Sequence, residues 1–338
     1  MKGIRGRTLR NLLGATALLT SGGAHASGLL NDGKVFLTGG VVTVDGAGGG
    51  GITPWATITG YETRDGINGG LHYTFVYLPD YSLNSYGAAV GFYDRFELSY
   101  THSTLPTGST FDTVGLLADT LGIETGIEPF NTTIGLNVYG AKLRLIGDAV
   151  YTSDSLIPQI AVGGFYKKND SKELLRTLQA DKSKDWEAYI CATKVYLAYS
   201  TLLNVTARYT SANQTGLTGF GGPDGNDKEV RWEGSVAFLL TKNTAIGGEF
   251  QQHGDNLDGV GVDLNGLDTG GLLGTVVDAV GLDRLNQTLT QYEDDWYDLF
   301  FAYAPNKNLS FTMAYAMLGN ITLTPDQHGF YFSLHATF

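Results

Sequence analysis

The chain has 338 residues, a formal net charge of −12 and one cysteine. An acidic chain repels the phosphate backbone, so a nucleic-acid partner is disfavoured. A single cysteine excludes a disulfide scaffold, a cysteine-rich zinc site and an iron–sulfur cluster. Charged residues make up only 17% of the chain, whereas 47 glycines, 19 tyrosines and 16 phenylalanines are present. This composition is typical of a protein with many strands and few helices.

The first residues have the pattern of a secretory signal peptide. Four basic residues precede a short apolar stretch at 12–19, and Ala24-His25-Ala26 fits the small-x-small cleavage motif. We therefore expect residues 1–26 to be removed and residues 27–338 to form one exported domain. The mature chain would carry 18 basic and 34 acidic residues, a net charge of −16. No run of 18 apolar residues occurs, so no transmembrane helix is predicted.

Alternation of apolar and polar residues dominates the rest of the chain. In residues 203–210, for example, Leu203, Val205 and Ala207 alternate with polar side chains. Runs of nine to twelve such residues suit tilted strands that cross a hydrocarbon layer. We predict strands near the following ranges: 35–45, 53–62, 69–78, 84–93, 95–103, 133–146, 157–168, 187–200, 202–211, 230–241, 244–252, 294–305, 308–317 and 328–338.

The connections between these strands alternate in length, which is typical of a transmembrane barrel with short inner turns and long outer loops. Short turns are predicted at 94–95, 200–201, 241–243 and 305–308, and long connections at 103–132, 169–185, 211–229, 252–294 and 319–327. The fold class is therefore an all-β, antiparallel, up-and-down transmembrane barrel of about 14 strands. The first strand is the weakest, because glycines interrupt it. If residues 35–52 lie in the lumen instead, parity gives 12 strands.

Two of the long connections are too apolar for free surface loops. Residues 111–127 and 264–289 contain clusters of leucine and valine. We expect short amphipathic helices there, which either fold into or over the lumen or pack against lipopolysaccharide.

Several linked motifs resemble the DUF3034 family of exported bacterial proteins without assigned function. They include residues 41–60 (VVTVDGAGGGGITPWATITG), Thr63-Arg64-Asp65, residues 85–91 (SYGAAVG) and Pro305-Asn306-Lys307. The resemblance extends from about residue 34 to residue 338. It supplies no catalytic or binding residues.

The last strand also resembles the assembly signal of outer-membrane proteins. Phe330, Phe332, Leu334 and Phe338 occupy alternate positions up to a terminal aromatic residue. This resemblance implies that the barrel-assembly machinery inserts the chain into the bacterial outer membrane. Outer-membrane lipid and lipopolysaccharide would then surround it.

Charged residues within the strands indicate which face is turned to the lumen, because Arg or Lys at the lipid midplane costs about 2–4 kcal/mol. By this criterion nine residues are candidates for lining the pore: Glu97, Lys142, Arg144, Lys194, Arg208, Arg231, Glu233, Glu249 and Asp298. We expect Glu97 to face the strand of Lys142 and Arg144, and Arg208 to face the strand of Arg231 and Glu233. Such charges either form salt bridges that stabilise the wall or constrict a channel and select its solutes.

The four tryptophans are expected in the aromatic girdles at the two membrane interfaces. Cys191 shares its face with Tyr189 and Val195, opposite Lys194, and is expected to be a lipid-facing or interfacial residue.

A barrel of this size is too wide for side chains alone to fill, so water or a folded-in segment must occupy it. The leading hypothesis is a passive, porin-like channel or transporter for small solutes. The alternatives are a plugged barrel with a structural or adhesive role, and a transporter of hydrophobic ligands. A lipid-modifying enzyme is disfavoured, because no paired histidine motif, nucleophile elbow or zinc-protease motif occurs. No catalytic residue, metal site or cofactor is predicted, and the oligomeric state stays open.

Overall fold

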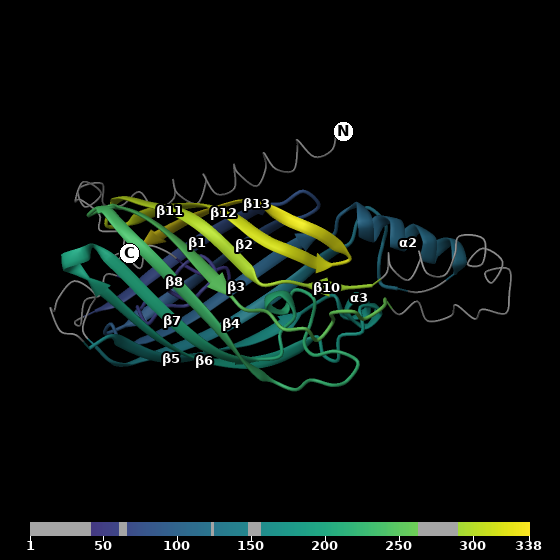
Figure 1. Ribbon diagram of the computed structural model, residues 1–338, viewed down its shortest axis with the longest axis horizontal. Coiled ribbons are helices and arrows are strands. Elements are labelled where there is room, and N and C mark those ends of the chain that lie inside the picture. The colour runs from purple at the N-terminus through teal and green to yellow at the C-terminus, as the bar shows by residue number, and fades with distance from the viewer. Residues whose placement is uncertain (1–41, 61–65, 123–124, 148–156, 263–289) are drawn as a thin grey trace.

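The computed structural model describes residues 42–60, 66–122, 125–147, 157–262 and 290–338. Within these ranges the strands form one antiparallel sheet that closes into a barrel (Figure 1). Consecutive strands pair with one another around the ring, and β13 closes it by pairing with β1 through eight residue pairs. The two-residue strand β10 extends the sheet beside the outer part of β12. The strands are β1 (Ile67–Tyr77), β2 (Ser82–Phe92), β3 (Phe96–Pro106), β4 (Thr133–Ile146), β5 (Gln159–Asn169), β6 (Lys184–Tyr196), β7 (Thr201–Thr210), β8 (Glu229–Thr241), β9 (Thr244–Gln251), β10 (Tyr292–Glu293), β11 (Trp296–Asn306), β12 (Leu309–Thr322) and β13 (Thr324–Thr337).

The ring therefore has 12 strands, which is the smaller of the two numbers that the sequence allowed. The strand expected at 53–62 is wrong over its described part, because residues 53–60 form no strand of the barrel and lie buried. The strand expected at 35–45 lies mostly outside the described residues. The residues themselves explain the error: 53–60 (TPWATITG) have no sustained apolar face to turn toward lipid, and five glycines at 46–51 precede them.

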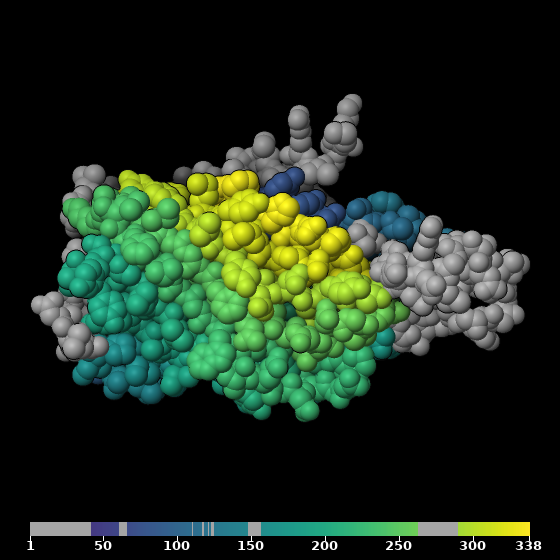
Figure 2. All heavy atoms as spheres, viewed as in Figure 1, coloured from purple at the N-terminus to yellow at the C-terminus, as the bar shows by residue number. Residues whose placement is uncertain are grey.

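The alternation of the sequence appears in the structure as two different faces. In β13, Phe330 and Phe332 are 49% and 47% exposed, whereas Tyr331 between them is 5% exposed. Apolar and aromatic residues of the other strands show the same outward exposure, including Leu203, Trp232 and Met313. On the face shown in Figure 2, the side chains of neighbouring strands abut and cover the wall. The fold thus presents an oil-like exterior and a polar interior.

Most of the long connections lie at one end, as predicted, although the outer β1–β2 connection (78–81) is short and the inner β4–β5 connection (147–158) is long and only partly described. One end, called here the inner end, carries the turns 93–95, 242–243 and 307–308 and the short helix η2 (Leu197–Tyr199). The outer end carries helices α2 (Ser109–Leu121) and α3 (Lys172–Thr177) and the helical turn η3 (Gln214–Gly216) (Figure 1). The long connection expected at 319–327 is wrong, because β12 and β13 continue through these residues with only Leu323 between them.

Helix α2 matches the helix expected in residues 111–127, although it is shorter. Gly122 ends it in the left-handed conformation with φ of 70°, which glycine adopts without strain. Its apolar face buries Phe111, Val114 and Ala118 over the outer end of the barrel. The second apolar connection, 264–289, lies entirely outside the described residues, and so does the helix expected there. None of the helices described here is long and apolar enough to span a bilayer.

An arginine on the outward face in the middle of a strand tests the assignment of the two faces. Val205 is exposed near the centre of β7, so Val205→Arg should lower the free energy of unfolding by about 2–4 kcal/mol in lipid vesicles. Leu240→Arg, near the inner end of β8, is the matched control and should cost about 0–1 kcal/mol. Urea titration monitored by tryptophan fluorescence measures both values. Equal costs at the two positions would contradict a hydrocarbon band around the barrel.

Candidate functional site

Residues 42–60, called here the plug, fill part of the lumen before the chain enters β1. Nearly every residue of this segment is buried. Its atoms make hydrogen bonds or ion pairs with side chains of eight consecutive strands, β2 to β9. The plug is therefore attached around two thirds of the wall and lies across the axial path.

Glu249 on β9 is the anchor at one side of the plug. Its carboxylate accepts hydrogen bonds from the backbone N–H groups of Gly51 (2.5 Å) and Ile52 (2.9 Å) and from the Thr53 hydroxyl (2.6 Å). Backbone donors satisfy a buried carboxylate without a cation. A Cβ on Gly50 would lie 1.7 Å from Glu249 Oε1, so a larger residue there would displace the carboxylate from this position.

Glu97 on β3 and Lys142 on β4 form a second anchor. Glu97 accepts hydrogen bonds from the backbone N–H groups of Gly48 (3.1 Å) and Thr59 (2.6 Å). Lys142 donates to the carbonyl oxygens of Gly48 (2.7 Å) and Trp55 (3.2 Å). The two side chains also pair with each other, with Nζ and Oε1 separated by 3.2 Å. This wall pair thus binds backbone atoms of the plug with both of its charges.

The third anchor is a cluster of five buried charges. Arg208 on β7 pairs with Glu187 (2.7 Å) and Glu233 (2.5 Å) on the neighbouring strands, and with Asp45 of the plug (3.1 Å). Lys167 on β5 pairs with Asp45 and Glu187, at 2.9 Å each. Two cations and three carboxyl groups therefore leave the cluster with an excess of negative charge when all are ionised.

Neutral hydrogen bonds complete the attachment of the plug. Trp55 Nε1 donates to the Ser235 hydroxyl at 2.9 Å, and the Thr206 hydroxyl donates to the carbonyl oxygen of Pro54 at 2.9 Å. The Thr53 and Ser235 hydroxyl groups also contact each other.

The connection between β7 and β8 forms a second obstruction nearer the outer end. Residues 211–220 are buried, and Lys167 donates to the carbonyl oxygen of Thr215 at 2.9 Å. Asn169 binds the carbonyl oxygens of Gly216 and Leu217 with its amide nitrogen. Gln214 Oε1 accepts a hydrogen bond from Trp296 Nε1 at 2.9 Å. The sequence predicts a long outer loop at 211–229, but it does not predict that residues 211–220 lie buried inside the barrel.

Eight of the nine residues expected to line the lumen are buried on the inner face. Glu97, Lys142, Arg208, Glu233 and Glu249 belong to the anchors above. Glu97 and Arg208 face the strands expected for them, and their partners there are Lys142 and Glu233. Arg144 pairs with Asp94 at the inner end, and Arg231 with Glu229 at the outer end. Asp298 is buried on β11, apart from these pairs.

Strand β6 reverses the expected faces. Lys194 lies on the outward side together with Ile190, whereas Glu187 and Cys191 point inward. The inner placement of Lys194 and the lipid-facing placement of Cys191 are therefore both wrong. Tyr189 and Cys191 are apolar residues packed inside the barrel, and their apolar character gave the strand the wrong phase. The same error concealed Glu187.

Two tryptophans also differ from expectation. Trp186 and Trp232 are exposed on the outer face, as a girdle requires, but Trp55 and Trp296 are buried inside the barrel. Trp55 belongs to the plug, and Trp296 faces the lumen from the first position of β11. Asp45 and Lys167 were not recognised by sequence reasoning. For Lys167 a signal existed, because it shares its phase with the buried Phe165 and Asn169.

Glu293 fixes the outer connection 252–262. One carboxylate oxygen accepts the backbone N–H of Leu257 at 3.2 Å, and the neighbouring Gln291 pairs with the backbone of Val260. Burial raises the pKa of Glu293 to about 7, opposed by the hydrogen bond from Leu257 and the charge of Arg231.

The described residues contain no group of three or more His, Cys, Asp or Glu side chains that could hold a metal ion.

The fold and the lumen together define a 12-stranded β-barrel with an internal plug. The family model of DUF3034, a protein family of unknown function, matches residues 38–335, and the chain belongs to this family. No curated protein matches the chain.

Solved structures similar to this chain include outer-membrane barrels. The KdgM porin is 8% identical with a TM-score of 0.44, and the match covers 80% of this chain and 99% of that one. The NanC porin is 6% identical with a TM-score of 0.41, over 80% and 98% of the two chains. The outer membrane phospholipase A of Escherichia coli is 10% identical with a TM-score of 0.36, over 80% and 92%. At such low identities and scores, these similarities say nothing about the activity of this chain.

Removal of one charge from the buried cluster should be costly. Arg208→Met leaves Glu187 and Glu233 without their common partner and should lower the free energy of unfolding by about 3–5 kcal/mol. Arg176→Met, in the exposed pair with Glu173, is the control and should change stability little. Denaturant titration of both variants in the same detergent gives the comparison. A cost for Arg208→Met no larger than that of the control would contradict a structural role for the cluster.

The position of Glu293 predicts a dependence on pH. The pKa of Glu293 in the folded chain lies above that of a free carboxyl group, so the protonated side chain favours the folded connection. This contribution to folding is complete below about pH 4.5 and is lost as the pH rises through about 7. The ionised carboxylate accepts the Leu257 hydrogen bond more strongly, but the cost of burying its charge is larger, so the connection should open more often at high pH. We therefore expect the amide of Leu257 to exchange its hydrogen faster at pH 8 than at pH 5, after correction for intrinsic exchange. Glu293→Gln should remove this pH dependence, whereas Glu128→Gln in another outer connection should keep it. A pH dependence that persists in Glu293→Gln would assign the effect to other groups.

Proposed function

We propose that this protein is a porin-like channel of the bacterial outer membrane whose resting state is closed by the plug. The outward apolar band and the closure of the sheet support a location in a bilayer. In this proposal residues 1–26 serve as an export signal, and residues 330–338 mark the chain for the barrel-assembly machinery. Outer-membrane lipid and lipopolysaccharide then contact the outward face. The proposed role is transport and includes no catalysis.

The observation that carries the proposal is the polar attachment of the plug to a wall that is complete without it. The plug precedes β1 in the chain, and β1 pairs with β2 and β13 through its own backbone. Departure of the plug therefore breaks no hydrogen bond between strands. The groups that it leaves behind, such as Glu249 and Lys142, are those that water solvates well.

The strength of this attachment favours the closed state. Hydrogen bonds to charged groups contribute about 1.5–3 kcal/mol each, and Glu249, Glu97 and Lys142 make seven such bonds to the plug. Openings of the wild-type channel should therefore be rare, and loss of the two carboxylates should make them more frequent.

Conductance across planar bilayers tests the proposal. We expect wild-type protein to open rarely and the double variant Glu97→Ala, Glu249→Ala to show larger or longer openings, because four backbone N–H groups of the plug lose their acceptors. Glu128→Ala, in an exposed outer connection, is the control and should behave like wild type.

A reversible covalent lock distinguishes movement of the plug from damage to the barrel. The Thr53 and Ser235 side chains are in contact, so cysteines at both positions are suitably placed for a disulfide in a Cys191→Ser background. In the double alanine variant, oxidation of this pair should abolish the openings and reduction should restore them. Openings that persist in the oxidised protein would exclude the plug as the gate.

A plugged barrel with a structural or adhesive role is the second candidate. It is favoured by the helices and long connections at the outer end, where α2 projects beyond the barrel (Figure 1). This role would be preferred if the folded double alanine variant conducts no more than wild type.

A further inference from the structure

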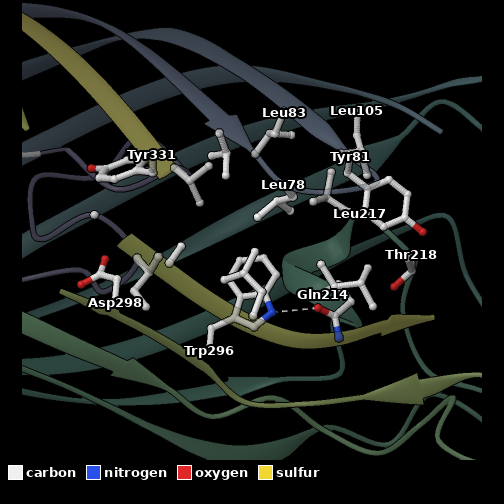
Figure 3. A pocket seen from close by; sticks show the side chains of 17 residues that line it. Leu78, Tyr81, Leu83, Leu105, Gln214, Leu217, Thr218, Trp296, Asp298 and Tyr331 are labelled. Atoms are coloured by element: carbon white, nitrogen blue, oxygen red, sulfur yellow. Dashed lines mark hydrogen bonds between the residues drawn. The ribbon is translucent and has the colours of Figure 1, made fainter. Parts of the chain in front are cut away.

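An apolar cavity lies between the plug and the β7–β8 connection (Figure 3). Its volume is about 50 Å³. Val44 and Ile52 of the plug border it on one side, and Leu217 of the connection borders it on the other. Six further lining residues are aliphatic side chains of β1, β2, β3 and β12, and Trp296 and Asp298 of β11 and Tyr331 of β13 also line it. The cavity therefore lies between the two obstructions, on the side of the barrel formed by β1–β3 and β11–β13.

One end of this cavity is polar and incompletely paired. Asp298 is 3% exposed, and no donor among the described residues reaches its Oδ1 atom. The hydroxyl group of Tyr331, also buried, likewise lacks a partner among the described residues. In Figure 3 these two side chains lie at the same end of the cavity. Asp298 Oδ1 and the Tyr331 hydroxyl are thus free to bind a ligand at this end, whereas Gln214 Nε2 and Thr218 Oγ1, which also lack a partner among the described residues, lie at the opposite end of the cavity.

The charges around Asp298 restrict the chemistry of that ligand. No lysine or arginine in the described part of the chain forms an ion pair with Asp298, and its partner across the sheet is Glu249, another carboxyl group. A buried carboxyl oxygen without a donor is costly, and a ligand that donates a hydrogen bond would remove this cost. A ligand with a carboxylate head would add a third acid to the same place.

We propose that this cavity binds a small amphiphile with an apolar body and a hydrogen-bond-donating head, either a primary ammonium or a hydroxyl group. The head would donate to Asp298 Oδ1, and the body would lie against Ile52, Leu83 and Leu217. A volume of about 50 Å³ holds only a few non-hydrogen atoms, so the ligand, or the part of it that enters, is short. As a statement about what the channel carries, this inference rests on the proposed function; as a statement about binding, it stands on the cavity alone.

Three probes with the same three-carbon chain test the chemistry of the head: n-propylamine, 1-propanol and propionate. They are titrated against the full chain in detergent micelles, with two readouts. The first is the midpoint of thermal unfolding, and the second is the emission of Trp296, which lines the cavity. We expect the amine and the alcohol to raise the midpoint and change the emission, and propionate to do neither. The emission change should be absent in Trp296→Phe.

Two wall residues locate the binding. Ala316 lies opposite Asp298 in the sheet and lines the cavity, so Ala316→Leu should fill the space and abolish binding of every probe. Asp298→Asn should reduce the preference for the amine over propionate by about tenfold or more. If Ala316→Leu does not fold, Leu318→Ala is the alternative, and the enlarged cavity should bind n-butylamine more tightly than wild type does.

The outcomes separate this inference from the channel itself. Equal effects of all three probes, or effects unchanged in Ala316→Leu or Leu318→Ala, would place the probes in the micelle and overturn the site. Binding as expected, without conductance by the double alanine variant, would retain the site and remove the channel. Conductance by the double alanine variant without binding of the probes would retain the channel and remove the site.

Discussion

A strand that crosses hydrocarbon has to pair every backbone N–H and C=O group with another strand, and this requirement governs the molecule. It forces the sheet to close on itself, which β13 and β1 achieve. Closure then assigns one side of every strand to lipid and the other to an enclosed space. Twelve strands enclose more space than their own side chains can fill. The plug and the β7–β8 connection occupy that space, and the charged inner face is what holds them.

The inner charges are balanced in two different ways. Within the cluster around Arg208, most partners belong to the wall itself, and Asp45 is the one contribution of the plug. At Glu249 the partners are backbone N–H groups of the plug, with no cation among its hydrogen-bond donors. The wall therefore keeps most of its ion pairs whether or not the plug is in place. In the vacated lumen, Glu97, Lys142 and Glu249 lose their plug partners, and the cluster loses the two ion pairs of Asp45.

The sequence predicts the barrel well because a period of two is a strong signal wherever lipid and water lie on opposite sides of a strand. For β4 the expected bounds of 133–146 match those of the structure, and those of β7 and β8 differ by at most one residue at either end. The pattern fails where it has no such cause. The plug forms no strand of the barrel, and the alternation in residues 53–60 that predicted one is not caused by lipid on one side of the chain. In β6, Tyr189 and Cys191 are apolar residues on the inner side, and the faces of that strand were reversed.

The candidate site was predictable only in part. Charges on strands indicate the inner face one residue at a time, which was enough to place Glu97 and Arg208 opposite the strands that hold their partners Lys142 and Glu233. Contacts with the plug join residues about 200 positions apart, such as Gly51 and Glu249, and no local pattern records them. The cavity beside Asp298 is likewise formed by segments that meet only in the folded chain.

The place of the plug in the chain has a consequence for biogenesis. It immediately precedes the first strand of the barrel, and that strand joins the last one at the seam between β1 and β13. If β1 and β13 paired before the plug entered, the large indole of Trp55 and the charge of Asp45 would have to pass through the open end of a closed barrel. A chain that instead wraps its remaining strands around the seated segment avoids this passage. The segment that seals the pore would then also serve as the internal template on which the cylinder is assembled.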